Sequence, residues 1–301
     1  MFSDTHFHFL HTVEILGIHE GGRILSGMAD RDCFFGLDIG TDAADLAGRQ
    51  DCVLRAISEI GDEAAAEKCR RFIRFSAGIW PDLESIRNRL ERMEVLSAQI
   101  GSAAENSGNG PLDRKIAAVG ECGIDHHWNP SGADGRSGAG FSSDDFDGER
   151  ELFMMQLELA RRLELPVIVH SRDAFDDTLG CIRDSGWSRG VIHCFSYGIS
   201  EARAFLDLGW YISLSGGITY TKRSRMDGMR ELLEFIPDDR ILCETDSPYL
   251  APVPFRGKTD TPLLVDNTYR FAAEMRGTDE FSLSRTVDRN ISSLFGMNPA
   301  Q

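Results

Sequence analysis

The strongest constraint on the fold of this 301-residue chain is an alternation of short apolar runs with longer helical patterns. Most short runs are β-branched and apolar on both sides of the strand alternation, which is typical of parallel strands buried on both faces. Strands are predicted at residues 1–4, 33–39, 72–79, 116–120, 166–170, 190–194, 210–214 and 240–244. Helices are predicted at residues 82–99, 149–165, 200–208, 228–235 and 262–276. Eight alternating strands favour an α/β fold of the TIM-type (β/α)8 barrel class, and no Gly-x-Gly-x-x-Gly follows a strand to indicate a Rossmann sheet.

Two stretches, residues 101–113 and 129–148, are rich in Gly, Ser and Asp. Such composition predicts surface loops inserted between the regular elements. Because the strand and helix alternation resumes after each stretch, neither indicates a domain boundary. Residues 1–301 are therefore predicted to form a single barrel domain with two loop insertions.

The charge balance excludes some classes of protein. The chain carries 32 Lys and Arg against 48 Asp and Glu, a formal net charge of −16, which argues against tight DNA binding through a basic face. No apolar run approaches the ~20 residues of a membrane span, and the first residues lack a signal-peptide pattern. The seven cysteines form no C-x-x-C pair. We therefore expect a cytoplasmic protein without membrane association, disulfide framework or zinc ribbon.

Metal-ligand residues recur where the predicted strands end, which is where a β/α barrel builds its active site. A His-x-His pair on a strand points both imidazoles to one face. Taken alone, such a pair is more often structural, and a lone carboxylate could face a helix dipole. Five strand ends carrying such residues together instead predict a hydrolytic centre for two divalent ions, with a carboxylate such as Glu121 able to bridge them. The candidates at these strand ends are four histidines, His6, His8, His170 and His193, and two carboxylates from a group that includes Glu121, Glu244 and Asp246.

The motifs around these residues resemble the TatD family of metal-dependent deoxyribonucleases. They lie at residues 4–9, 119–125, 166–174, 193–196 and 244–250, and the resemblance extends from residue 2 to about residue 297. It implies an amidohydrolase-like barrel that hydrolyses DNA phosphodiester bonds with metal-activated water, commonly as a 3′→5′ exonuclease. It also implies one ion held by His6, His8, Glu121 and Asp246, and a second held by Glu121, His170 and His193. Glu121 and Asp246 would be the catalytic carboxylates, with Asp246 orienting or deprotonating the water; the ions could be Zn²⁺, Mg²⁺ or Mn²⁺.

Basic residues near the predicted strand ends are candidates for binding substrate. Arg172 lies two residues past a candidate ligand, where a guanidinium could hold a phosphate bidentately. The alternative for Arg172 is a salt bridge to Asp173 or Glu244. Other basic residues are expected around the barrel mouth, although they could form only a solvated surface. They are Lys222, Arg223 and Arg225 after the seventh strand, and Arg256 and Lys258 after the eighth.

Some positions depart from the family pattern. Trp80 stands where the family usually has His, and could either stack on a base or pack at the rim. Tyr197 replaces a common Gly, and Asp260 replaces a common Asn. Together with the insertion at residues 129–148, these changes bear on substrate preference more than on metal chemistry.

The leading hypothesis is a divalent-metal-dependent deoxyribonuclease that binds DNA weakly at the barrel mouth and needs no obligate protein partner. An amidohydrolase-type enzyme acting on a small ester, lactone or phosphotriester is the first alternative. A catalytically inactive metal-binding partner module is the second, and the presence of all six candidate ligands argues against it.

Overall fold

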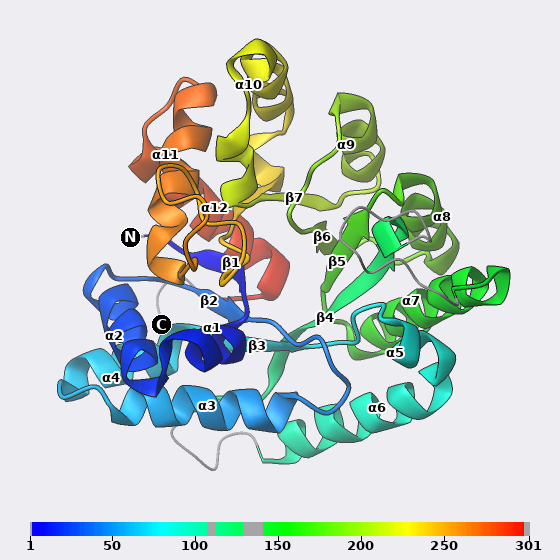
Figure 1. The fold of residues 1–301 in the computed structure, drawn as a ribbon, viewed down its shortest axis with the longest axis horizontal. Coiled ribbons are helices and arrows are strands. Elements are labelled where there is room, and N and C mark those ends of the chain that lie inside the picture. The colour runs from blue at the N-terminus through cyan, green and yellow to red at the C-terminus, as the bar shows by residue number, and fades with distance from the viewer. Residues whose placement is uncertain (1, 107–111, 129–140, 298–301) are drawn as a thin grey trace.

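The computed structural model describes residues 2–106, 112–128 and 141–297. Its centre is an eight-stranded parallel sheet in which the strands follow one another in sequence order. The strands are β1 (Asp4–Phe7), β2 (Gly36–Asp38), β3 (Ile73–Ala77), β4 (Ile116–Asp125), β5 (Val167–Arg172), β6 (Gly190–Ile192), β7 (Tyr211–Leu214) and β8 (Ile241–Cys243). Figure 1 shows these strands gathered in the middle of the molecule with the helices around them.

The sheet curls until its two edges meet. The Asp246 N–H donates to the His6 carbonyl at 2.9 Å, and the His8 N–H donates to the Ser247 carbonyl at 2.7 Å. A parallel bridge also joins Phe7 to Ser247. These contacts make a nearly closed barrel, which confirms the predicted fold class.

Helices follow most of the strands and cover the outside of the barrel (Figure 1). Several begin at an aspartate that accepts backbone N–H bonds of the first turn, as Asp62, Asp82 and Asp279 do. The α-helices are α1 (Phe9–Leu16), α2 (Ile18–Asp30), α3 (Leu46–Ser58), α4 (Glu63–Phe72), α5 (Leu83–Arg87), α6 (Arg89–Glu105), α7 (Ser143–Leu163), α8 (Phe175–Ser185), α9 (Ile199–Leu206), α10 (Met226–Phe235), α11 (Val265–Met275) and α12 (Glu280–Phe295). Short 3₁₀ helices are η1 (His126–Trp128), η2 (Gly216–Tyr220), η3 (Arg223–Arg225), η4 (Asp238–Arg240) and η5 (Pro262–Leu264).

The strand interiors are as apolar as the sequence pattern indicates. Val167, Ile168 and Val169 of β5 are all fully buried, although successive side chains point to opposite faces of a strand. The sheet is therefore covered on both faces, as expected for parallel strands. None of the helices in the described part of the chain is both long and apolar enough to cross a membrane.

Some predicted boundaries are wrong. The first strand begins at Asp4 rather than ending there, and β4 continues to Asp125. The predicted helix at residues 82–99 is two helices, α5 and α6, with a break at Asn88.

The two predicted loop insertions are shorter than expected where the structure describes them. Residues 101–105 continue α6, and residues 143–148 form the start of α7, where Ser142 and Asp145 make a capping box. The remaining loop residues 107–111 and 129–140 lie outside the described residues.

Candidate metal centre

All six candidate ligands converge at the C-terminal end of the barrel. His6 lies in β1 and His8 directly follows that strand. Glu121 lies within β4, and His170 lies within β5. The other two, His193 and Asp246, follow β6 and β8. The structure thus brings together residues that span nearly the whole sequence.

Four of these residues form one group of donors, here called the first half-site: His6, His8, Asp246 and the Oε2 atom of Glu121. The His6 Nε2 atom lies 3.3 Å from His8 Nε2 and 3.4 Å from both carboxylate oxygens. The His8 Nε2 atom lies 3.7 Å from Glu121 Oε2 and 3.4 Å from Asp246 Oδ1. Tetrahedral bonds of ~2.0–2.2 Å to zinc place donors about 3.4 Å apart, so this group fits one ion.

The second half-site consists of His170, His193 and the other oxygen of Glu121. Glu121 Oε1 lies 2.9 Å from His170 Nδ1 and 3.0 Å from His193 Nε2. The two imidazole nitrogens are 3.4 Å apart. Each oxygen of Glu121 therefore faces a different pair of histidines, which is the arrangement of a carboxylate that bridges two ions. The donor set fits two divalent cations.

Glycines let β4 approach β5 closely enough to place Glu121. Gly120 has φ +136°, and a Cβ there would lie 2.6 Å from the Ile168 carbonyl oxygen. Gly123 has φ +152°, and its Cβ would lie 1.8 Å from the His170 carbonyl oxygen. Any other residue type at either position would therefore displace a strand that carries a candidate ligand.

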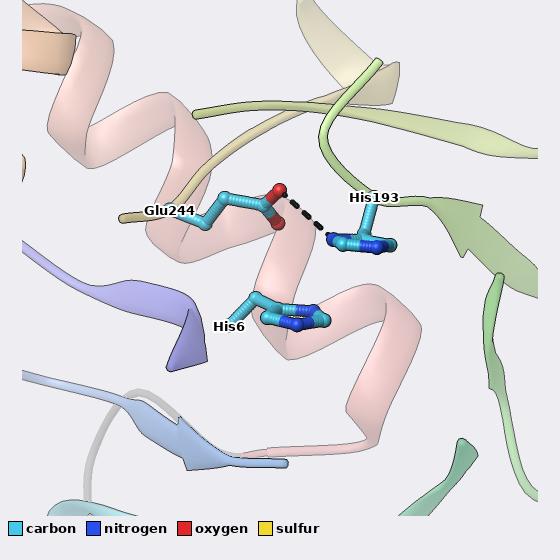
Figure 2. A group of neighbouring side chains, drawn as sticks. All are labelled: His6, His193 and Glu244. Carbon is cyan, nitrogen blue, oxygen red and sulfur yellow. Dashed lines mark ion pairs between the residues drawn. The ribbon is translucent and has the colours of Figure 1, made fainter. Parts of the chain in front are cut away.

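Two buried carboxylates contact the outer nitrogens of the second half-site. His170 Nε2 lies 3.0 Å from Asp125 Oδ2, and His193 Nδ1 lies 3.5 Å from Glu244 Oε1. Figure 2 shows Glu244 reaching His193 while the His6 ring lies parallel to the His193 ring, with centroids 4.0 Å apart. Carboxylates in this position fix the orientation of a metal-binding imidazole and raise its basicity. The sequence analysis gives neither Asp125 nor Glu244 this role, although both lie in the strand-end motifs.

Glu244 also belongs to a third potential cluster, with His6 and His193. Its carboxylate already accepts bonds from the Cys194 N–H and the Ser213 hydroxyl, each at 2.5 Å. The Nε2 atoms of both histidines face the two half-sites. We therefore interpret Glu244 as a residue that orients the His193 imidazole rather than as a metal ligand.

The electrostatics of the centre favour an ionised Glu121. Burial alone would raise the pKa of this carboxyl group, but the surrounding imidazoles, led by the charge of His193, hold the pKa well below its usual value. Burial opposes protonation of His6 and lowers its pKa. Glu121 is thus available as an anionic ligand rather than as a proton donor.

The predicted substrate-binding residues lie at the same end of the barrel. Arg172 ends β5, is half-buried, and among the described residues pairs with neither Asp173 nor Glu244. Lys222 and Arg223 are exposed on the segment after β7. The exposed Arg256 guanidinium carbon lies 4.3 Å from the centroid of the Tyr220 ring, which brings the segments after β7 and β8 together. Their role in binding stays a prediction.

The positions that depart from the family pattern also lie near the centre. The Trp80 ring meets the His170 ring edge-on, with centroids 5.7 Å apart. The Tyr197 hydroxyl bonds to Ser171 Oγ at 2.9 Å and accepts the Ala174 N–H at 3.1 Å, so it holds the segment after β5. Asp260 is fully buried, and burial raises its pKa to about 8.

Comparison with known proteins gives a consistent result. A family model described as TatD related DNase matches residues 4–296. The metal-dependent hydrolase YcfH of Escherichia coli K12 is 29% identical over 307 aligned positions, which cover 99% of this chain and 97% of YcfH. The 3′-5′ ssDNA/RNA exonuclease TatD of Klebsiella pneumoniae is 32% identical over 192 positions, covering 61% of this chain and 66% of that protein. The crystal structure of YjjV, a TatD homologue of E. coli K12, superposes with a TM-score of 0.72 at 24% identity, covering 99% of this chain and 98% of that chain.

Proposed function

Because this chain belongs to the TatD-related DNase family and is a metal-dependent hydrolase, we propose that it hydrolyses phosphodiester bonds in DNA. The observation that carries this proposal is the pair of half-sites that share Glu121. We propose the 3′→5′ exonucleolytic mode because a relative from K. pneumoniae is named a 3′-5′ ssDNA/RNA exonuclease.

In this proposal His6, His8 and Asp246 hold one ion, His170 and His193 hold the other, and Glu121 holds both. Two bound dications would supply Lewis acidity at the phosphoryl group and would lower the pKa of an attacking water. The mixture of imidazoles and carboxylates is compatible with Zn²⁺, Mn²⁺ or Mg²⁺.

The protein residues then position the reactants. Asp246 is the proposed proton acceptor and orients the attacking water from the edge of the first half-site, where its side chain is 14% exposed. Arg172, two residues past His170, is the proposed ligand for the phosphate, since a planar guanidinium matches two phosphate oxygens. Lys222, Arg223 and Arg256 are the proposed contacts for neighbouring phosphates.

A cleavage assay on 3′-labelled single-stranded DNA tests the activity. Wild type loaded with Mg²⁺, Mn²⁺ or Zn²⁺ should release labelled nucleotide from the 3′ end, and chelation should stop it. Glu121→Ala should lower kcat by at least ~100-fold, because both half-sites lose a ligand. The matched control is His19→Ala, whose side chain is 79% exposed on α2 and should leave cleavage unchanged.

The same assay separates the alternatives. No cleavage by metal-loaded wild type would contradict the deoxyribonuclease proposal. Hydrolysis of small esters, lactones or phosphotriesters in its place would support the small-substrate hydrolase. Internal cuts without end-directed release would leave a deoxyribonuclease but contradict the exonucleolytic mode.

Metal analysis tests the ligand assignment independently of activity. Wild type should bind two ions per chain, and His170→Ala should bind one with an affinity close to that of the wild-type first half-site. His19→Ala should bind two. A His170→Ala protein that still binds two ions as tightly as wild type would contradict the assignment.

A further inference from the structure

An aromatic pair lies beside the first half-site. Tyr249 is 51% exposed, and its N–H donates to the Asp246 carbonyl at 3.0 Å, which fixes its backbone near a candidate ligand. Its ring meets the His8 ring at 66°, with centroids 5.9 Å apart. The His11 ring stacks on the His8 ring at 5.4 Å, and His11 Nδ1 lies 3.3 Å from the Tyr249 hydroxyl. Tyr249 is thus held in place while half of its surface stays open to solvent.

Another aromatic side chain lies beside the second half-site. Trp80 is half-buried, and its backbone N–H donates to the Thr41 carbonyl at 2.9 Å. The preceding residue is also fixed, because the Ile79 N–H and carbonyl both bond to the side-chain amide of Gln156. The Trp80 ring contacts His170 edge-on, so its position is defined relative to the metal ligands.

The ligand imidazoles connect these two aromatic side chains. Successive ring centroids are 5.7, 5.6, 4.0, 5.1 and 5.9 Å apart along one row. The row consists of Trp80, His170, His193, His6, His8 and Tyr249. A phosphate bound between the two half-sites would therefore have an aromatic side chain near it on the side of each half-site.

Nucleobases stack on such rings. Stacking of one base on an aromatic side chain is worth about 1–3 kcal/mol and tolerates any base, because every base has a π face. A base inside a duplex is already paired and stacked between its neighbours, so only an unpaired base can use these rings.

We propose that Tyr249, supported by His11, and Trp80 form two stacking subsites for the unpaired nucleobases on either side of the scissile phosphate. The proposal rests on the proposed function and adds to it the residues that would hold the two bases next to the cleaved bond, without regard to sequence. The two-sided arrangement makes an unpaired terminus a better substrate than a duplex terminus.

Kinetics on matched substrates test this proposal. One single-stranded oligodeoxynucleotide carries normal bases at its last two positions, and the other carries tetrahydrofuran abasic residues there. Tyr249→Leu keeps apolar bulk but removes the ring, and should raise KM for the normal substrate about 10-fold. KM for the abasic substrate should change less than ~2-fold. Tyr249→Phe restores the ring and should restore KM for the normal substrate.

Equilibrium binding gives a readout that does not depend on turnover. We expect the fluorescence anisotropy of the same labelled oligonucleotides, measured with chelator present, to show that Tyr249→Leu loses affinity for the normal oligonucleotide but not for the abasic one. Trp80→Leu should weaken binding of the normal substrate in the same way. The control is Phe281→Leu: Phe281 is 55% exposed and stacks on Phe2, which precedes β1. It should change neither measurement.

The outcomes separate this proposal from the proposed function. If wild type cleaves single-stranded DNA and Tyr249→Leu affects normal and abasic substrates equally, or affects neither, the stacking subsites are wrong and the deoxyribonuclease stands. If metal-loaded wild type cleaves neither oligonucleotide, the proposed function fails first. Melting temperatures of the variants show whether any loss reflects unfolding.

Discussion

Glu121 shows what a single residue contributes at this centre. The sequence predicts it as a ligand from its place at a strand end, and the structure places its two oxygens against different histidine pairs. All six candidate ligands come together, as the sequence predicts. The end of a strand gives the level of a side chain in the barrel, and the two-residue period of a strand gives the face to which it points. The supporting roles of Asp125 and Glu244 do not follow from the sequence, since they depend on which nitrogen of each imidazole faces the half-site.

A second residue, Asp260, links the departure from the family pattern to stability. Its Oδ1 atom accepts the Thr261 N–H at 2.8 Å, whereas Oδ2 is buried without a hydrogen-bond partner among the described residues. Burial raises the pKa of Asp260 to about 8, against ~3.9 in an unfolded chain. The folded state therefore binds the proton more tightly, and the free energy of unfolding should fall as the pH rises from ~4 to ~8.

Asp260→Asn should remove that pH dependence. Asn keeps an acceptor for Thr261 and stays neutral, so its melting temperature relative to wild type should increase by a few degrees between pH 5 and pH 9. The measurement is thermal unfolding of chelator-treated protein, in which no dication offsets the carboxylate. Asp239→Asn, at a site with a 73% exposed side chain, is the control. Parallel curves for wild type and Asp260→Asn would show that the buried carboxyl group does not titrate in this range.

Among the elements, strands were easier to predict than helices. All eight predicted strands overlap the observed ones, the first of them only at Asp4, since runs buried on both faces have a distinctive composition. The sequence analysis gives no range for α1 to α4, and α2 shows why. It contains Gly21 and Gly22, which disfavour a helix locally. Both glycines are needed for close packing of α2 against its neighbours. A Cβ at Gly21 would lie 2.8 Å from Val13 Cγ2, and a Cβ at Gly22 would lie 2.8 Å from Glu59 Cβ.

The start of α7 carries a prediction of its own. Asp145 accepts the Ser142 N–H at 2.7 Å and two bonds from Arg87 of α5, each at 2.9 Å. Hydrogen bonds from Arg87 hold the pKa of Asp145 below its usual value. Asp145→Asn should therefore destabilise the protein by about 1–2 kcal/mol at pH 7, through the lost cap and ion pair.

The pH dependence of this effect follows from the lowered pKa. The ionised carboxyl group stabilises the native state at pH values above ~4, and that contribution decreases as acid protonates it, so the two proteins should converge below pH 4. Denaturant unfolding at several pH values measures the difference. Asp147→Asn, at an exposed site on the same helix, should stay within ~0.5 kcal/mol of wild type. A constant difference down to acid pH would assign the effect to packing.

At the scale of the whole molecule, the net charge of −16 has the same sign as the phosphates of the proposed DNA substrate, so the two repel each other. The basic residues Lys222, Arg223 and Arg256 lie on segments at the barrel end that carries the half-sites. General repulsion with local attraction predicts weak capture of a DNA strand end that depends strongly on salt.

Arg223→Ala tests this charge distribution. If Arg223 contacts a phosphate, the variant should raise KM and reduce the slope of log KM against log salt by about 1. Steady-state kinetics between 50 and 200 mM salt, roughly the range over which phosphate contacts show, measure that slope. Arg162→Ala, at an exposed site near the end of α7, is the control. A slope identical to that of wild type would show that Arg223 does not contact a DNA phosphate.

The closure of the barrel between β1 and the segment after β8 has a consequence for the order of assembly. In the described chain this seam consists of the Phe7–Ser247 bridge, two backbone hydrogen bonds, and side-chain hydrogen bonds that join Thr5 to Cys243 and Asp4 to Thr245. The first half-site lies across the same seam, since His6 and His8 come from one side of it and Asp246 from the other. During synthesis Glu121, His170 and His193 emerge from the ribosome before Asp246 does. The residues of the second half-site are therefore all synthesised before those of the first are complete, and the first half-site can form only once the seam has brought Asp246 to His6 and His8.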